Sequence, residues 1–222
     1  MKRTVTFGLT AMFSLAFGIA SADAAISLTN GSFETPALPV NSYQTGFADT
    51  SWQQSLTDSV AGGIVRENIF GFELVNNGKA PDGVQWAFLR ESSYIYQAIG
   101  SVNAGERIDV SFVQYMQSNI GNTSSGLSIE IWNGNPTSGG SLLDAATFGG
   151  LAPTVLAQRQ ATLDPGGAVS DLYFVVRAIN DIGNNNVSFD NIVLSVVPEP
   201  ASLALIAAGG LLLVRRRRVA HG

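Results

Sequence analysis

The sequence predicts an all-β protein whose body folds as a two-sheet antiparallel β-sandwich, placed between an N-terminal signal peptide and a short C-terminal hydrophobic helix. Three observations indicate the sandwich. Apolar residues alternate with polar ones in several segments, turns rich in Gly, Asn, Ser and Asp separate these segments, and no stretch between residues 25 and 197 carries a long i, i+3, i+4 apolar stripe. We therefore expect few and short helices in the body.

The first 24 residues have the features of a secretory signal peptide. Lys2 and Arg3 form a positive start, residues 5–20 are largely apolar, and Ala22 and Ala24 form an A-x-A cleavage site. Small and polar residues follow, where a membrane span would need a charged stop. We expect cleavage near Ala24 and export of the rest of the chain.

The body, residues 25–197, contains segments with clear period-two alternation. They lie at residues 108–112, 127–132 and 172–178, and each is typical of a strand with one face on a core. A body of about 170 residues suits one domain with a substantial core.

The apolar alternation of the last predicted strand changes phase at Asp190-Asn191. The apolar residues on either side are Val187 and Phe189 before the change, and Ile192, Leu194 and Val196 after it. A phase change of this kind predicts a β-bulge, where one extra residue re-aims the side chains.

Composition excludes several classes of function. The chain has no cysteine, and its one histidine, His221, lies in the C-terminal tail, so the body lacks the residues for Ser-His-Asp, Cys-His or thiol redox chemistry and for a zinc site built from imidazole or thiolate. The body carries six basic and fifteen acidic residues, a net charge of −9. Such an acidic body argues against nucleic acid and anionic lipid surfaces as partners.

An exposed aromatic platform flanked by hydrogen-bonding groups is what sugar recognition requires. Trp132 is the leading candidate, because it falls on the polar face of its predicted strand beside an Asn-Gly-Asn turn, and Tyr115 and Tyr173 occupy comparable outward positions. A covering loop is the alternative for Trp132. Trp52 and Trp86, set among strand residues, are expected in the core.

The C-terminal 25 residues combine a small motif, a run of 14 mostly apolar residues from Ala201 to Val214, and a basic stop. This arrangement resembles the PEP-CTERM sorting signal of Gram-negative bacteria, and we assign it residues 198–222. Its motif is Pro198, Glu199 and Pro200, and its basic stop is Arg215, Arg216, Arg217 and Arg218. The resemblance implies recognition by an exosortase, transient anchoring in the inner membrane, and a final place at the cell surface or in the extracellular matrix.

The length of the apolar run favours a transient anchor over the alternative, an ordinary single-helix anchor. At 1.5 Å per residue the run spans about 21 Å as a helix, against a hydrocarbon core of about 30 Å. Gly209-Gly210 further weakens a stable helix. The arginines should hold the C-terminus on the cytoplasmic side and leave the body outside.

Five segments of the body together resemble the galactose-binding-like jelly rolls of carbohydrate-binding modules. They are residues 30–34, 81–89, 95–99, 104–112 and 189–192, and they follow one another in the family's order. The resemblance implies one structural calcium ion, with Glu34 and Asp190 as ligands and backbone carbonyls completing the site; calcium prefers such oxygen donors. In the alternative reading, Glu34 caps a turn and Asp190 accepts backbone N–H bonds at the bulge.

Two hypotheses of different classes follow for the function. The first is a non-catalytic, secreted surface protein that associates with extracellular polysaccharide or biofilm matrix, which the sorting signal's resemblance implies because exosortase systems accompany exopolysaccharide production. The second is a structural or adhesive surface protein that binds protein partners. A two-carboxylate glycoside hydrolase ranks third, because no Asp/Glu pair stands out at motif spacing.

Overall fold

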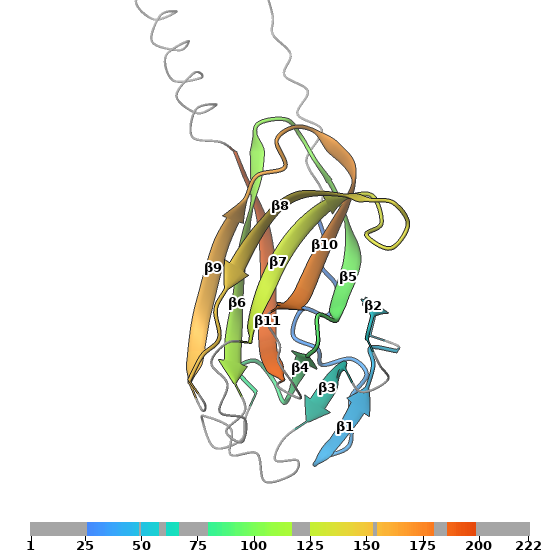
Figure 1. The fold of residues 1–222 in the computed structure, drawn as a ribbon, viewed down its shortest axis with the longest axis vertical. Coiled ribbons are helices and arrows are strands. Elements are labelled where there is room, and N and C mark those ends of the chain that lie inside the picture. The colour runs from blue at the N-terminus through green and yellow to red at the C-terminus, as the bar shows by residue number, and fades with distance from the viewer. Residues whose placement is uncertain are drawn as a thin grey trace, which may run out of the picture.

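The computed structural model describes residues 26–48, 50–57, 61–66, 80–116, 125–152, 155–179 and 186–198. These residues form strands and loops, and the strands lie in two layers (Figure 1). The strands are β1 (Ser42–Thr45), β2 (Gln53–Ser55), β3 (Gly62–Arg66), β4 (Gln85–Leu89), β5 (Tyr94–Val102), β6 (Glu106–Met116), β7 (Gly126–Asn133), β8 (Ser141–Phe148), β9 (Leu156–Leu163), β10 (Val169–Ile179) and β11 (Val187–Pro198).

Both layers are antiparallel sheets, so the predicted all-β sandwich is confirmed. One sheet has the strand order β1-β3-β4-β11-β6-β9, and the other has the order β2-β5-β10-β7-β8. The three segments predicted from alternation fall within β6, β7 and β10. Strands β10 and β11 lie at the centres of their sheets although they come last in the chain, so both sheets are completed by their C-terminal strands.

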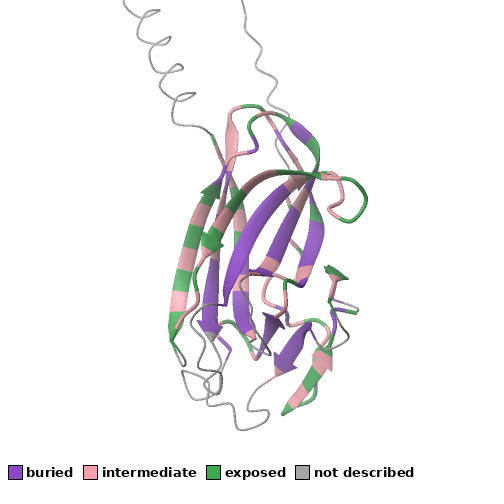
Figure 2. Cartoon of the chain, viewed as in Figure 1, coloured by how far each residue is buried: buried purple, intermediate pink, exposed green. Residues whose placement is uncertain are grey.

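The core between the sheets is built by the alternation seen in the sequence. Ile108 and Phe112 of β6 face Phe174 and Val176 of β10 across one apolar cluster, and all four are buried. Figure 2 shows buried residues along the central strands and an alternation of exposed and half-buried residues on the edge strand β9. The opposite parity of each strand lies on an outer face, and these outer faces carry the candidate sites.

The predicted bulge in β11 is present. The pairing of β11 with β6 shifts register between Asp190 and Val193, and Asn191 has a φ of 52°, in the left-handed region. The N-terminal segment lies against the bulge, where the Ile192 N–H donates to the Gly31 carbonyl at 3.0 Å. A Cβ on Gly31 would lie 2.3 Å from the Ile192 oxygen, so this close approach requires glycine.

Both terminal signals lie almost entirely outside the described residues. This applies to the signal peptide with Ala22 and Ala24, to Glu199 and Pro200, to the apolar run and to Arg215–Arg218. Pro198 is the last residue of β11 and pairs with Glu106, so the sandwich extends one residue past the predicted boundary into the sorting motif. In the part of the chain that the structure describes, no helix is long and apolar enough to cross a membrane.

Candidate ligand-binding face of the five-stranded sheet

Four aromatic side chains share the outer face of the five-stranded sheet. We call them the aromatic strip: Tyr94 and Tyr96 of β5, Tyr173 of β10 and Trp132 of β7. Tyr173 lies directly opposite Trp132 in the β10–β7 pairing, and its ring centroid is 6.3 Å from that of Tyr96, which is 6.0 Å from that of Tyr94. The strip therefore runs across three neighbouring strands.

The aromatic strip is partly open to solvent. Tyr94, Trp132 and Tyr173 are half-buried, while Tyr96 is buried. Val175, which lies between them on the same face, is fully covered. Trp132 and Tyr173 thus occupy the outward positions expected from the sequence, and their role in ligand binding stays a prediction.

An ion pair lies beside the strip and fixes its geometry. Arg177 of β10 donates to both carboxylate oxygens of Glu130, from Nε at 2.8 Å and from a terminal nitrogen at 3.2 Å. The same guanidinium lies 4.0 Å from the centroid of the Tyr94 ring, a cation–π distance. Glu130 also accepts a hydrogen bond of 2.8 Å from Trp132 Nε1. Sequence reasoning did not connect Glu130 to Trp132.

The loop of residues 134–140 joins β7 to β8 (Figure 1). The hydroxyls of Thr137 and Tyr96 are 3.1 Å apart, and Asn135 Oδ1 accepts hydrogen bonds from the N–H and the hydroxyl of Thr137. The Gly134 N–H donates to the Asp171 carbonyl at 2.7 Å, which ties the start of the loop to β10. The loop reaches across to β5 and leaves Trp132 half-exposed, so the alternative in which a loop covers Trp132 holds only in part.

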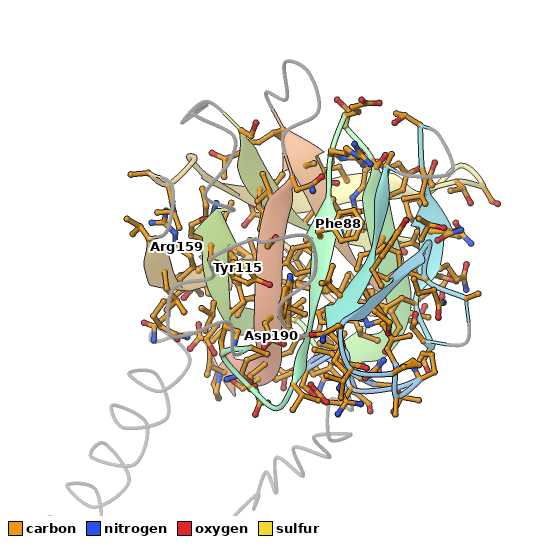
Figure 3. All side chains as sticks on the ribbon, turned by 90° about the horizontal axis from the view of Figure 1, so that it is seen from below. Phe88, Tyr115, Arg159 and Asp190 are labelled. Carbon is orange, nitrogen blue, oxygen red and sulfur yellow. The ribbon has the colours of Figure 1, made fainter. Side chains whose placement is uncertain are left out.

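The prediction that Tyr115 is an exposed platform is wrong. Tyr115 is 3% exposed and packs edge-to-face against Trp86, with ring centroids 5.8 Å apart. Alternation correctly directs Tyr115 away from the inter-sheet core, but the outer face of the six-stranded sheet has an apolar cluster of its own. That cluster consists of Val65, Ala80, Trp86, Phe88 and Tyr115. Figure 3 shows Phe88, Tyr115 and Asp190 on this sheet. Trp86 is therefore buried as expected, but in this second cluster, whereas Trp52 lies in the main core.

Three polar atoms in or beside this second cluster are buried without hydrogen-bond partners. They are Trp86 Nε1, Tyr115 Oη and Ser188 Oγ, from β4, β6 and β11. Burial raises the pKa of Tyr115 well above its usual value, the charge of Asp190 adds to this rise, and the nearby Ser188 hydroxyl offsets part of it. Unpaired buried polar groups are rare in native proteins and costly.

Glu34 and Asp190 both accept hydrogen bonds from backbone N–H groups, as the alternative to calcium binding predicts. Glu34 Oε1 accepts hydrogen bonds of 2.8 Å from the N–H groups of Val84 and Gln85. Asp190 accepts from the N–H of Asp82 at 2.9 Å and from its neighbour Asn191 at 2.7 Å. The two carboxylates therefore tie the segment before β4 to the N-terminal segment and to the bulge of β11.

Asp190 is the most perturbed acid among the described residues. Desolvation raises its pKa from 3.8 to about 8; the backbone hydrogen bonds from Asp82 and Asn191 oppose this rise, while the charges of Asp82 and Glu34 add to it. Both predicted calcium ligands bind the short segment 82–85, so they lie near each other. Their hard oxygen donors fit calcium. No group of three or more His, Cys, Asp or Glu residues within the described ranges is arranged to hold a metal ion, so backbone carbonyls would have to complete such a site.

A shallow groove of about 420 Å³ lies on the outer face of the six-stranded sheet, over β6, β9 and β11. Its lining includes Asp109, Ser111, Gln160, Thr162 and Ser195, and it has no aromatic residue. A sugar ring has no platform to stack on there, so the aromatic strip is the better candidate site.

The fold resembles solved β-sandwich structures. The Stig cyclase Fisc from Fischerella sp. TAU is 16% identical with a TM-score of 0.59, and the match covers 79% of this chain and 98% of that one. An apo cyclase from Fischerella sp. is 17% identical, also with a TM-score of 0.59, over 79% of this chain and 97% of that one. TmCBM61 in complex with β-1,4-galactotriose is 12% identical with a TM-score of 0.49, over 78% and 99%. At these identities the similarity concerns the fold alone, and no curated protein sequence matches the chain.

The C-terminal signal is confirmed by a match to a family. Residues 196–218 match the PEP-CTERM protein-sorting motif, which contains the tripeptide, the apolar run and the arginines identified in the sequence. This chain is therefore a two-sheet antiparallel β-sandwich that carries a PEP-CTERM protein-sorting motif at its C-terminus.

Proposed function

We propose that this protein is exported, processed by an exosortase, and retained at the cell surface or in the extracellular matrix, where its sandwich binds polysaccharide without catalysis. The sorting motif supports the first part of the proposal, because PEP-CTERM motifs imply export and exosortase sorting. The C-terminal apolar run anchors the protein in the inner membrane only transiently, since the run is short for a permanent span.

The aromatic strip is the observation that carries the binding proposal. Sugar rings present C–H faces that pack on aromatic rings, and their hydroxyls hydrogen-bond to flanking polar groups. Tyr94, Trp132 and Tyr173 are half-exposed on one continuous face. Asn135 in the bordering loop and the exposed carboxylate of Asp171 supply hydrogen-bonding groups at its edge.

The groups around the strip favour binding over hydrolysis. Hydrolysis by carboxylates needs one group that donates a proton and another that attacks or activates water. The buried carboxylate at the strip, Glu130, is already committed to Arg177 and to Trp132 Nε1. The body also has no cysteine and no histidine. We therefore propose that the strip holds sugar chains and leaves them intact.

A glycan array probed with the purified exported protein tests this function. We expect retention by one class of polysaccharide. Trp132→Ala and Tyr173→Ala should each weaken it about five- to thirtyfold, because loss of one stacking ring removes about 1–2 kcal/mol. Tyr43→Ala is the matched control, since Tyr43 is an exposed tyrosine on β1 of the other sheet and its loss should leave retention unchanged.

Three outcomes would count against the proposal. Retention that survives both strip substitutions would place the binding site elsewhere. Absence of retention on every glycan would favour the alternative of a structural or adhesive protein that binds protein partners. Release of sugar from an incubated polysaccharide would show a hydrolase.

A further inference from the structure

Three charged side chains border the aromatic strip on the described outer face of the five-stranded sheet. Arg177 is positive, and Glu130 and Asp171 are negative. The Arg177 side chain is 25% exposed, whereas that of Glu130 is only 7% exposed. The cation therefore lies at the surface with its counter-charge beneath it.

Glu130 neutralises the charge of Arg177 within the protein. Glu130 takes two of its N–H groups, and the Tyr94 ring lies against its guanidinium at 4.0 Å. Because Glu130 already neutralises this charge, an acidic sugar gains little net attraction from Arg177 unless it displaces the buried carboxylate, and displacement would leave an uncompensated buried charge. The exposed carboxylate of Asp171 would repel the same ligand.

Glu130 also positions the ring on which a sugar would stack. Trp132 lies two residues further along β7 on the same face, and its Nε1 donates to the carboxylate oxygen that also faces Arg177. The indole N–H is thereby occupied, so Trp132 offers a ligand its ring face and not a hydrogen bond. A ring fixed before binding loses less conformational freedom when the ligand arrives.

We propose that the aromatic strip is specific for neutral polysaccharides, and that Glu130 sets this specificity by engaging Arg177 and by positioning Trp132. The proposal rests on the polysaccharide-binding function proposed above. It names the ligand class as an uncharged chain of sugar rings, and it assigns the rejection of uronate polymers to one side chain.

The decisive variant is Glu130→Gln, which keeps the side chain's shape and its oxygen acceptor for Trp132 but removes the charge that engages Arg177. We expect the wild type to bind a neutral polysaccharide and to bind a polyuronate at least about tenfold more weakly. In Glu130→Gln, affinity for the polyuronate should rise about tenfold and fall again as salt is added, because an exposed guanidinium pairs with carboxylates in a screened interaction. The specificity is measured as the ratio of the two affinities, which should shift about tenfold towards the polyuronate even if the substitution also weakens the hold on Trp132.

Two further variants separate this mechanism from a general loss of negative charge. Asp171→Asn removes an acid from the same face without releasing a cation, so it should give a much smaller gain for the polyuronate. Adding Arg177→Met to Glu130→Gln should abolish the gain. Thermal melting of each variant shows whether it is folded, and the comparison of the two polymers on the wild type decides the specificity even where a variant unfolds.

The inference fails if the wild type binds the polyuronate as tightly as the neutral chain. It also fails if folded Glu130→Gln binds the neutral chain and shows no gain for the polyuronate, or if Asp171→Asn gives an equal gain. The proposed function fails separately, if the wild type binds no polysaccharide or if Trp132→Ala has no effect.

Discussion

The two outer faces of the sandwich each hold a buried carboxylate beside aromatic rings, and they stabilise it differently. On the five-stranded sheet, Glu130 is paired with Arg177 at 2.8 Å. On the six-stranded sheet, Asp190 is fully buried, accepts two backbone N–H bonds, and faces the further acids Asp82 and Glu34. Burial is costly for a charged carboxylate on either face, but within the described residues a cation pairs with Glu130 and none with Asp190.

The difference shows how local context decides the charge of a buried acid. An ion pair allows Glu130 to serve as a fixed anion that holds Trp132. Asp190 lies among acids, and its pKa rises to about 8, so near neutral pH it holds a proton. In our proposal the face with the ion pair binds the ligand, whereas we expect the stability of the other face to depend on pH or on a bound cation.

The largest expected effect is the pH dependence of stability caused by Asp190. Its pKa is about 8 in the folded protein and near 3.8 when unfolded, so between these values the folded state binds the extra proton. The contribution of Asp190 to the free energy of unfolding should therefore be largest below about pH 4 and should fall, by up to about 5 kcal/mol, as pH rises towards 8. Denaturant unfolding in chelator at several pH values measures this slope, and Asp190→Asn should flatten it. A wild-type slope equal to that of Asp190→Asn would contradict the prediction.

The next effect concerns the ion pair. Arg177→Met leaves Glu130 buried without its partner, and we expect a loss of about 3 kcal/mol in the free energy of unfolding. Arg107→Met is the control, because Arg107 pairs with Asp164 at 3.2 Å with both side chains substantially exposed, so its loss should cost less than about 1 kcal/mol. Equal losses in the two variants would show that the buried Glu130–Arg177 pair stabilises the protein no more than an exposed ion pair does.

Calcium would change the comparison by giving Asp190 the counter-charge that Glu130 already has. If Glu34 and Asp190 hold a calcium ion, its addition should stabilise the protein by about 3 kcal/mol at one hundred times the dissociation constant. The gain should grow with pH, because the ion competes with the proton on Asp190. Melting curves in EDTA and in calcium test this, and Glu34→Gln and Asp190→Asn should each remove the response. Identical wild-type curves in both solutions would exclude the site.

The smallest effect should come from the unpaired hydroxyls near Asp190. Tyr115→Phe and Ser188→Ala each delete a buried polar atom that makes no hydrogen bond, so each should leave stability unchanged or raise it by up to about 1 kcal/mol. Thr50→Val is the contrasting variant, because the buried Thr50 hydroxyl donates to the Phe47 carbonyl at 2.7 Å and its loss should destabilise. A clear loss in Tyr115→Phe or Ser188→Ala would reveal a partner for that hydroxyl, such as an ordered water.

The aromatic residues show which parts of the candidate site can be predicted from the sequence. Alternation placed Trp132, Tyr173 and Tyr115 outward from the inter-sheet core, and all three do point away from it. Only Tyr115 is buried, because it packs against Trp86 of β4, a strand that is not adjacent to β6 in the sheet. Tyr94 and Tyr96 were missed as members of the strip, although the same period-two rule applied to β5 would have placed both on one face.

The sequence by itself determined the β architecture, the phase change at Asp190 and the sorting motif, because each depends on residues that are close together in the chain. Periodicity reports which face a side chain takes, and a targeting signal is read as a linear pattern. Only the tertiary structure decided which outward residues meet. Glu130 and Arg177 are 47 positions apart, and Asp82 and Asp190 are 108 apart. Such contacts follow from strand order and register, which bring a cation to one buried acid and other acids to the second.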